Sequence, residues 1–147
     1  MLVLTVDGGM NTAMNIAVSG MLAASAGLNA SASNLANLES DGPVPATSPQ
    51  QPVAPAPGSV YQPVHVTDAA QPGGGVSTTV SPSLPAYTLA YDPGAPFANM
   101  QGMVAAPNID PAREVVNQIT ASLAYKANIA TFKTAQQMEK TLLDALA

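Results

Sequence analysis

A long segment near the start of the chain constrains the fold most, because between Asn11 and Leu38 there is neither a proline nor a charged residue. Apolar side chains recur there every seven residues, at Met14, Met21, Leu28 and Leu35, and smaller ones follow the same interval at Ala17, Ala24 and Ser31. A heptad repeat is typical of a helix that packs along another helix. At 1.5 Å per residue, this helix would be about 42 Å long.

The opposite face of this segment is polar but uncharged, with Asn15, Ser19, Asn29 and Ser33. A membrane span is the rival interpretation, but it needs about 20 predominantly apolar residues, and these Asn and Ser side chains argue against it. We therefore expect a helix enclosed by other helices, to which the Asn and Ser side chains hydrogen-bond.

A second long helix is predicted at the C-terminal end. Asp110 is a typical N-cap, Pro111 suits the first helical position, and Glu114 in the first turn favours the helix dipole. No Gly or Pro follows up to Ala147. At 1.5 Å per residue, this helix would be about 54 Å long.

This second segment has two apolar tracks and one basic stripe. The first track comprises Val116, Ile119, Leu123, Ala127, Ala130, Met138 and Leu142, and the second comprises Val115, Ile129, Phe132, Leu143 and Leu146. Two apolar faces predict two sets of neighbours. The basic stripe is Lys126, Lys133 and Lys140, which is either a solvated face or a surface that meets acidic groups on adjacent subunits.

The region between the helices contains the turn and strand signals. Gly42 and Pro43 end the first helix, and the prolines of Pro43–Ser59 predict an extended or disordered loop. Short strand candidates follow at 60–67, 76–81, 86–91 and 103–106. They predict one antiparallel sheet of three or four strands, too small to be stable alone.

Composition narrows the function. Charged residues make up 9% of the chain, its net charge is −5, and no Lys or Arg precedes Arg113. Nucleic-acid binding needs clustered basic residues, and an acidic surface suits anionic lipids poorly. With 4% aromatic residues and no Trp, the chain has little material for a large core of its own. We expect much of its burial to occur between chains, the alternative being a partly disordered Ala/Pro-rich chain.

Motifs for chemistry are missing from the sequence. There is no cysteine, and the single histidine, His65, has no Cys or acidic residue at ligand spacing. Neither Gly-rich stretch has the context of a phosphate loop. We therefore expect no enzymatic activity, no cofactor and no metal.

Three groups of residues, in this order along the chain, carry a family resemblance. They are Met14–Met21 with Ala32–Asn37, then Tyr91–Pro96 with Ala98–Val104 and Pro107–Pro111, and finally Ala121–Asn128. Together they resemble the flagellar basal-body rod proteins, and most closely the proximal-rod class of that family. The alternatives are another axial component of the flagellum, such as another rod class or a hook-related protein, or a secreted or periplasmic binding module that uses Tyr61, Tyr87 and Tyr91.

The resemblance implies a fold that is mainly α with a small β insertion. The two terminal helices would pair as an antiparallel coiled coil, with short antiparallel strands between them. The expected division is an N-terminal extension at 1–10, a helical core domain from 11–42 and 108–147, a Pro-rich loop at 43–59 and a β region at 60–107. Met1 and Met10 both remain possible starts.

It also implies a structural role. Subunits of this family assemble helically into a hollow shaft that crosses the periplasm, transmits motor torque and passes exported subunits. The expected partners are further copies of the chain, other rod proteins, proteins at the junction of rod and MS ring, and the type III export apparatus that would export it without signal cleavage. No nucleic acid and no membrane insertion are expected.

The residues expected to carry assembly are packing residues. We expect the row Met14, Met21, Leu28 and Leu35 to pack against Val116, Ile119, Leu123 and Met138. The family motifs and the apolar track add Asn34, Asn37, Tyr125, Asn128 and Leu142 to this set.

Overall fold

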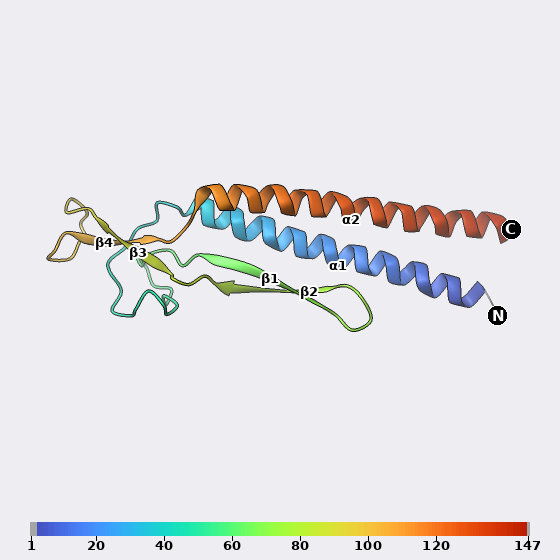
Figure 1. The fold of residues 1–147 in the computed structure, drawn as a ribbon, viewed down its shortest axis with the longest axis horizontal. Helices are drawn as coiled ribbons and strands as arrows, with labels where there is room; N and C mark the ends of the chain where they lie inside the picture. The colour runs from blue at the N-terminus through green and yellow to red at the C-terminus, as the bar shows by residue number, and fades with distance from the viewer. Residues whose placement is uncertain (1–2, 147) are drawn as a thin grey trace.

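The computed structural model describes residues 3–146, which form two long helices and four short strands. The elements are α1 (Val3–Ala36), β1 (Val64–Ala70), β2 (Val76–Pro82), β3 (Tyr87–Tyr91), β4 (Met103–Pro107) and α2 (Pro111–Leu146). The molecule is elongated, and the two helices lie side by side (Figure 1). The start of α1 and the end of α2, which we call the outer helix ends, lie at the same end of the molecule.

The two helices are antiparallel. Gly20 of α1 faces Asn128 of α2, and Gly27, seven residues later, faces Ala121, seven residues earlier. A constant register over a heptad is the mark of helices that run along each other. The predicted fold class, mainly α with paired terminal helices and a small antiparallel β insertion, is confirmed.

The bounds of α1 differ from the expected ones. The helix begins at Val3 rather than near Asn11, and it ends at Ala36 rather than at Leu38. No proline precedes Asn11, and a glycine such as Gly9 costs a helix only about 1 kcal/mol relative to Ala. Met10 is 8% exposed, and burial of its side chain offsets that cost.

The strands form two separate two-stranded sheets, so the prediction of one sheet of three or four strands was wrong. β1 and β2 pair from Val64 opposite Pro82 to Ala70 opposite Val76, and β3 pairs with β4. Between β2 and β3, Pro85 has no N–H to donate, and the Ala86 N–H bonds to the Pro49 carbonyl instead of to a strand. Prolines therefore interrupt the ladder at the point where one sheet would have continued into the next.

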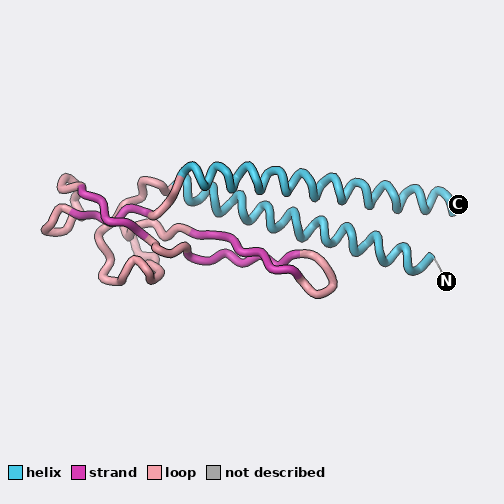
Figure 2. The backbone as a smooth tube through the Cα atoms, viewed as in Figure 1, coloured by secondary structure: helices cyan, strands magenta, loops and turns pink. Residues whose placement is uncertain are grey.

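The Pro-rich loop packs on the second sheet. Val53 and Val60 form a buried cluster with Ala86, Tyr87 and Ala105, and this cluster is the core of the β region. The Tyr87 hydroxyl donates to the Thr47 carbonyl at 2.6 Å. Residues 43–59 form a loop with turns and no helix or strand (Figure 2). Contacts of Thr47 and Val53 with the second sheet hold this loop in place.

Candidate assembly site

Small residues form the innermost row of α1. Ala17, Ala24 and Ser31, at heptad intervals, are 1%, 7% and 2% exposed. The larger side chains at Met14, Met21, Leu28 and Leu35 are only half-buried beside them. Small side chains let two helix axes approach closely, and the larger ones then lie at the flanks of the contact.

Glycines tighten the contact further. A methyl group at Gly20 would lie 2.5 Å from Asn128 Oδ1, so only glycine fits there without moving that side chain. At Gly27 the same methyl group would make ordinary contact with Ala121, 3.6 Å away. Asn128, one of the predicted residues, is held against α1 by a hydrogen bond from Nδ2 to the Ala124 carbonyl of its own helix.

On α2, the side that faces α1 includes three of the predicted assembly residues, but not the four that were expected to pack against the Met14 row. Ala135 is buried there, and Tyr125, Asn128, Phe132 and Leu142 are half-buried. By contrast, the predicted partners of α1 are exposed: 58% at Val116, 56% at Ile119, 61% at Leu123 and 59% at Met138. The expected pairing of these four residues with the Met14 row therefore does not occur within the chain. Periodicity revealed two apolar faces but does not show which of them faces α1.

A polar junction joins α1, α2 and β1 at the point where the two helices meet the β region. Its centre is Asn34, which is 2% exposed. Its Nδ2 donates to the Val64 carbonyl at 2.8 Å and to Glu114 Oε1 at 2.9 Å. Its Oδ1 accepts from the Val64 N–H at 3.0 Å and from the Tyr61 hydroxyl at 3.2 Å. One amide of α1 thus bonds to groups of α2, of β1 and of the loop that precedes β1.

Glu114 is the second member of the junction. Its carboxylate accepts hydrogen bonds from Ser31 Oγ, from Asn34 Nδ2 and, at 3.3 Å, from Asn117 Nδ2. Sequence reasoning placed Glu114 only as a favourable charge in the first turn, because position in a helix says nothing about the neighbouring helix. The start of α2 itself is as predicted, with Asp110 Oδ1 accepting from the Ala112 and Arg113 N–H groups.

Asn37 closes the end of α1. Its Nδ2 donates to the Ser33 carbonyl at 2.9 Å, and its Oδ1 accepts from Ser40 Oγ at 3.1 Å. The following turn is fixed to the β region, because Gly42 and Ala105 exchange backbone hydrogen bonds at 3.0 and 2.9 Å. Asn34 and Asn37 therefore orient the β region relative to the helix pair.

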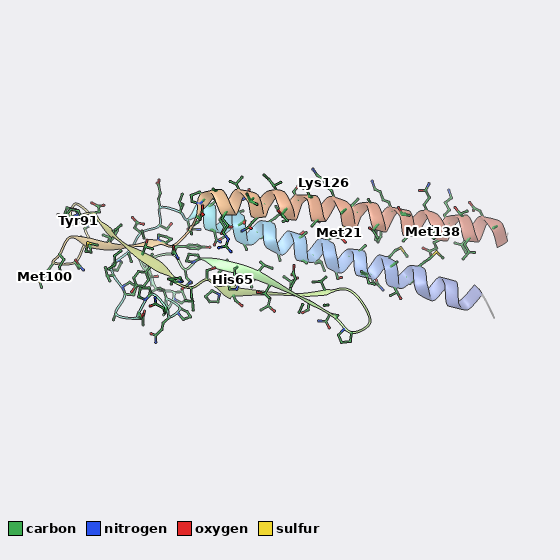
Figure 3. The ribbon with its side chains drawn as sticks, viewed as in Figure 1. Met21, His65, Tyr91, Met100, Lys126 and Met138 are labelled. Atoms are coloured by element: carbon green, nitrogen blue, oxygen red, sulfur yellow. The ribbon has the colours of Figure 1, made fainter. Side chains whose placement is uncertain are left out.

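The alternative binding surface of three tyrosines is not assembled. Tyr61 belongs to the polar junction, and Tyr87 is buried in the core cluster. Tyr91 is exposed near Met100, at the end of the molecule away from the outer helix ends (Figure 3). Within residues 3–146, no three His, Cys, Asp or Glu side chains gather as a metal site would require. None of the helices in this range is long and apolar enough to span a membrane.

The outer surface of α2 is apolar and uncovered in the single chain. Val115, Val116, Ile119 and Leu123 follow one another at the spacing of a single helix face, and each is at least 46% exposed. We call these four residues the outer face. A contiguous apolar face of this kind is typical of an interaction surface rather than of a free monomer.

Comparisons of the sequence with known proteins point to one family. The family model for the C-terminal region of flagellar basal body rod FlgEFG proteins matches residues 100–145, which include β4 and all of α2 except its last residue. Flagellar basal-body rod protein FlgC of Salmonella typhimurium strain LT2 is 39% identical over 84% of this chain and 88% of its own length. The FlgC proteins of Yersinia enterocolitica and Aquifex aeolicus are 40% and 34% identical, over 87% and 90% of this chain and 92% and 94% of their own lengths. This chain belongs to the FlgC family of flagellar basal-body rod proteins.

Proposed function

We propose that this rod protein is a non-enzymatic subunit of the proximal rod, where it assembles helically into a hollow shaft that transmits torque and passes exported subunits. Family membership supports the structural role. The observation that carries the proposal is the outer face, which stays exposed although α1 and α2 already cover each other's inner faces.

Burial energetics favour assembly over a free monomer. Complete burial of a Val, Leu or Ile side chain contributes about 1.5–3 kcal/mol. The buried apolar cluster formed by the loop and the β region has five residues, two of which are alanines. The outer face therefore offers a neighbouring subunit a contribution comparable with the chain's own small core.

The proposal includes the division of the chain. The helical core domain of the shaft would consist of segments 11–42 and 108–147. The loop 43–59 and the β region 60–107 would be attached to this domain. Residues 3–10, which lie in the proposed N-terminal extension, continue α1. In keeping with the family, the subunit would leave the cell by type III export without signal cleavage and contact other rod proteins, the MS-ring junction and the export apparatus.

The test is a charge placed on the outer face. In a strain that depends on this chain, Leu123→Asp is expected to abolish motility and to leave basal bodies without a complete rod. Its circular dichroism as a purified chain should match that of the natural chain, because Leu123 is exposed in the single molecule. Leu123→Met, which keeps the apolar surface, should retain motility. A fully motile Leu123→Asp strain would refute the proposal.

The position of the chain in the basal body distinguishes the proximal rod from the other axial roles. Labelling the chain in purified basal bodies is expected to place it in the part of the rod nearest the MS ring. A label in the distal rod or the hook would favour the alternative axial component instead.

A further inference from the structure

A groove runs along the molecule with α1 as its floor. α1 contacts α2 on one side and the β1–β2 hairpin on the other, and it lies between them (Figure 1). The space between these walls is a groove of about 940 Å³. Its floor is made of small residues, which are Gly20, Ala23, Ala24, Gly27 and Ala30.

The walls of the groove are partly apolar and partly acidic. Val64, Val66 and Val76 line it from the hairpin, and Ala121 and Ala124 line it from α2. Asn117, Thr120 and Asn128 add neutral polar groups to the α2 wall. Because Gly20 and Gly27 already face α2, the hairpin valines together with Ala121 and Ala124 provide the apolar surface for an added helix. The groove therefore has the shape and surface of a site for a third helix.

Charge indicates which helix fits. Three carboxylates line the groove, from Asp68, Asp110 and Glu114, against one guanidinium, from Arg113. All other basic residues of the chain lie on α2, and Lys126 follows Leu123 by three residues, which places it near the outer face. A helix that presents apolar knobs and then a lysine is complementary to an apolar groove with an acidic rim.

We propose that the outer face of α2 in one subunit, with Val116, Ile119 and Leu123 as its knobs, docks in the groove between α1, α2 and the β1–β2 hairpin of a second copy. The inference rests on the proposed function and specifies its subunit contact. Knobs and groove are different surfaces of the same chain, so the contact is head-to-tail. Such contacts propagate into an open helical assembly unless the rotation closes a ring.

Cysteine cross-linking tests the contact directly, since the natural chain has no cysteine. The probe is the chain with Val66→Cys in the groove wall and Ile119→Cys on the outer face, assembled in basal bodies and treated with a short bis-maleimide. We expect a ladder of covalent dimers and larger multimers, because each subunit carries both halves of the contact.

The matched control pairs Ile119→Cys with Thr67→Cys. Thr67 is the next residue of β1, is exposed, and points to the opposite face of the hairpin. This pair is expected to give rods but no ladder. Rods that yield equal ladders from both pairs, no ladder from either, or links to a different rod protein alone would overturn the docking while leaving the proposed function intact.

A second variant decides the matter if the cysteine pair does not assemble. Ala124→Leu fills the groove from an exposed position on α2 and is expected to prevent rod formation, whereas Ala145→Leu, exposed near the end of α2, is expected to permit it. Rods of normal length from Ala124→Leu would overturn the docking. Absence of the natural chain from rods altogether would instead refute the proposed function.

Discussion

At the scale of single residues, the polar junction shows how one buried amide can fix the relative placement of three elements. Asn34 pairs with both backbone groups of Val64 and with Glu114. All buried side-chain polar atoms in the described residues have partners, so the junction carries no uncompensated group. A buried network of this kind stabilises one geometry strongly and tolerates the loss of a member poorly.

Asn34→Asp is the sharpest change at this scale. It keeps the shape of the side chain but replaces the Nδ2 donor with an oxygen that faces the Val64 carbonyl and the Glu114 carboxylate. We expect the free energy of unfolding to fall by about 3 kcal/mol, since a buried charge loses its hydrogen-bond partner and meets a like charge. Thermal unfolding followed by circular dichroism measures the loss.

Two further variants identify the cause. Asn29→Asp adds the same charge at an exposed position of α1 and should change stability by less than about 0.5 kcal/mol. Glu114→Gln in the Asn34→Asp background supplies an N–H donor in place of the second carboxylate and should restore most of the loss. Equal stability of Asn34→Asp and Asn29→Asp would show that the junction does not hold the elements together.

At the scale of elements, the β1–β2 hairpin is docked on α1 through its turn. The Val76 N–H donates to Ser19 Oγ at 3.1 Å, which fixes the start of β2 to the helix. Gly73 and Gly74 have φ values of 101° and 97°, a region that L-residues other than glycine rarely adopt. A methyl group at Gly74 would also lie 2.6 Å from Ile16 Cδ1, whereas at Gly73 it would meet nothing within 4 Å.

These two glycines make a matched pair of variants. Gly73→Ala and Gly74→Ala both carry the strain of positive φ, about 1–2 kcal/mol, but only Gly74→Ala adds a clash with α1. The contact is with the tip of the Ile16 side chain, which is 39% exposed and can turn aside. We therefore expect amide hydrogen exchange at Val76 to rise only a few-fold in Gly74→Ala over Gly73→Ala. Indistinguishable exchange in the two variants would mean that Gly74 does not pack closely against Ile16.

The sequence predicted the elements better than their partners. Heptad spacing indicated α1, and the Asp110-Pro111 signal predicted the start of α2. The division into two sheets was missed because alternation identifies strands but not the ladder that joins them. The hydrogen bond from the Ala86 N–H to the Pro49 carbonyl also involves a residue that is far away in the sequence. The role of Glu114 was missed for the same reason, since Ser31 and Asn34 lie on another helix.

At the scale of the whole molecule, the inner and outer surfaces of the helix pair have different chemistry. Small residues form the innermost row of α1 in its contact with α2, whereas the large apolar side chains of Val116, Ile119, Leu123 and Met138 remain exposed on α2. The predicted assembly residues Val116, Ile119, Leu123 and Met138 all belong to this uncovered set. A compact monomer would place them inside, so their exposure indicates that the single chain is an incomplete unit.

A cryo-EM map of basal bodies that contain this chain tests this central claim most directly. It resolves the surroundings of Val116, Ile119 and Leu123 on α2 in every subunit. We predict that these side chains are covered by helices of neighbouring subunits. A rod in which these side chains face the lumen or the solvent, and in which the chain contacts its neighbours only through the β region, would contradict the account.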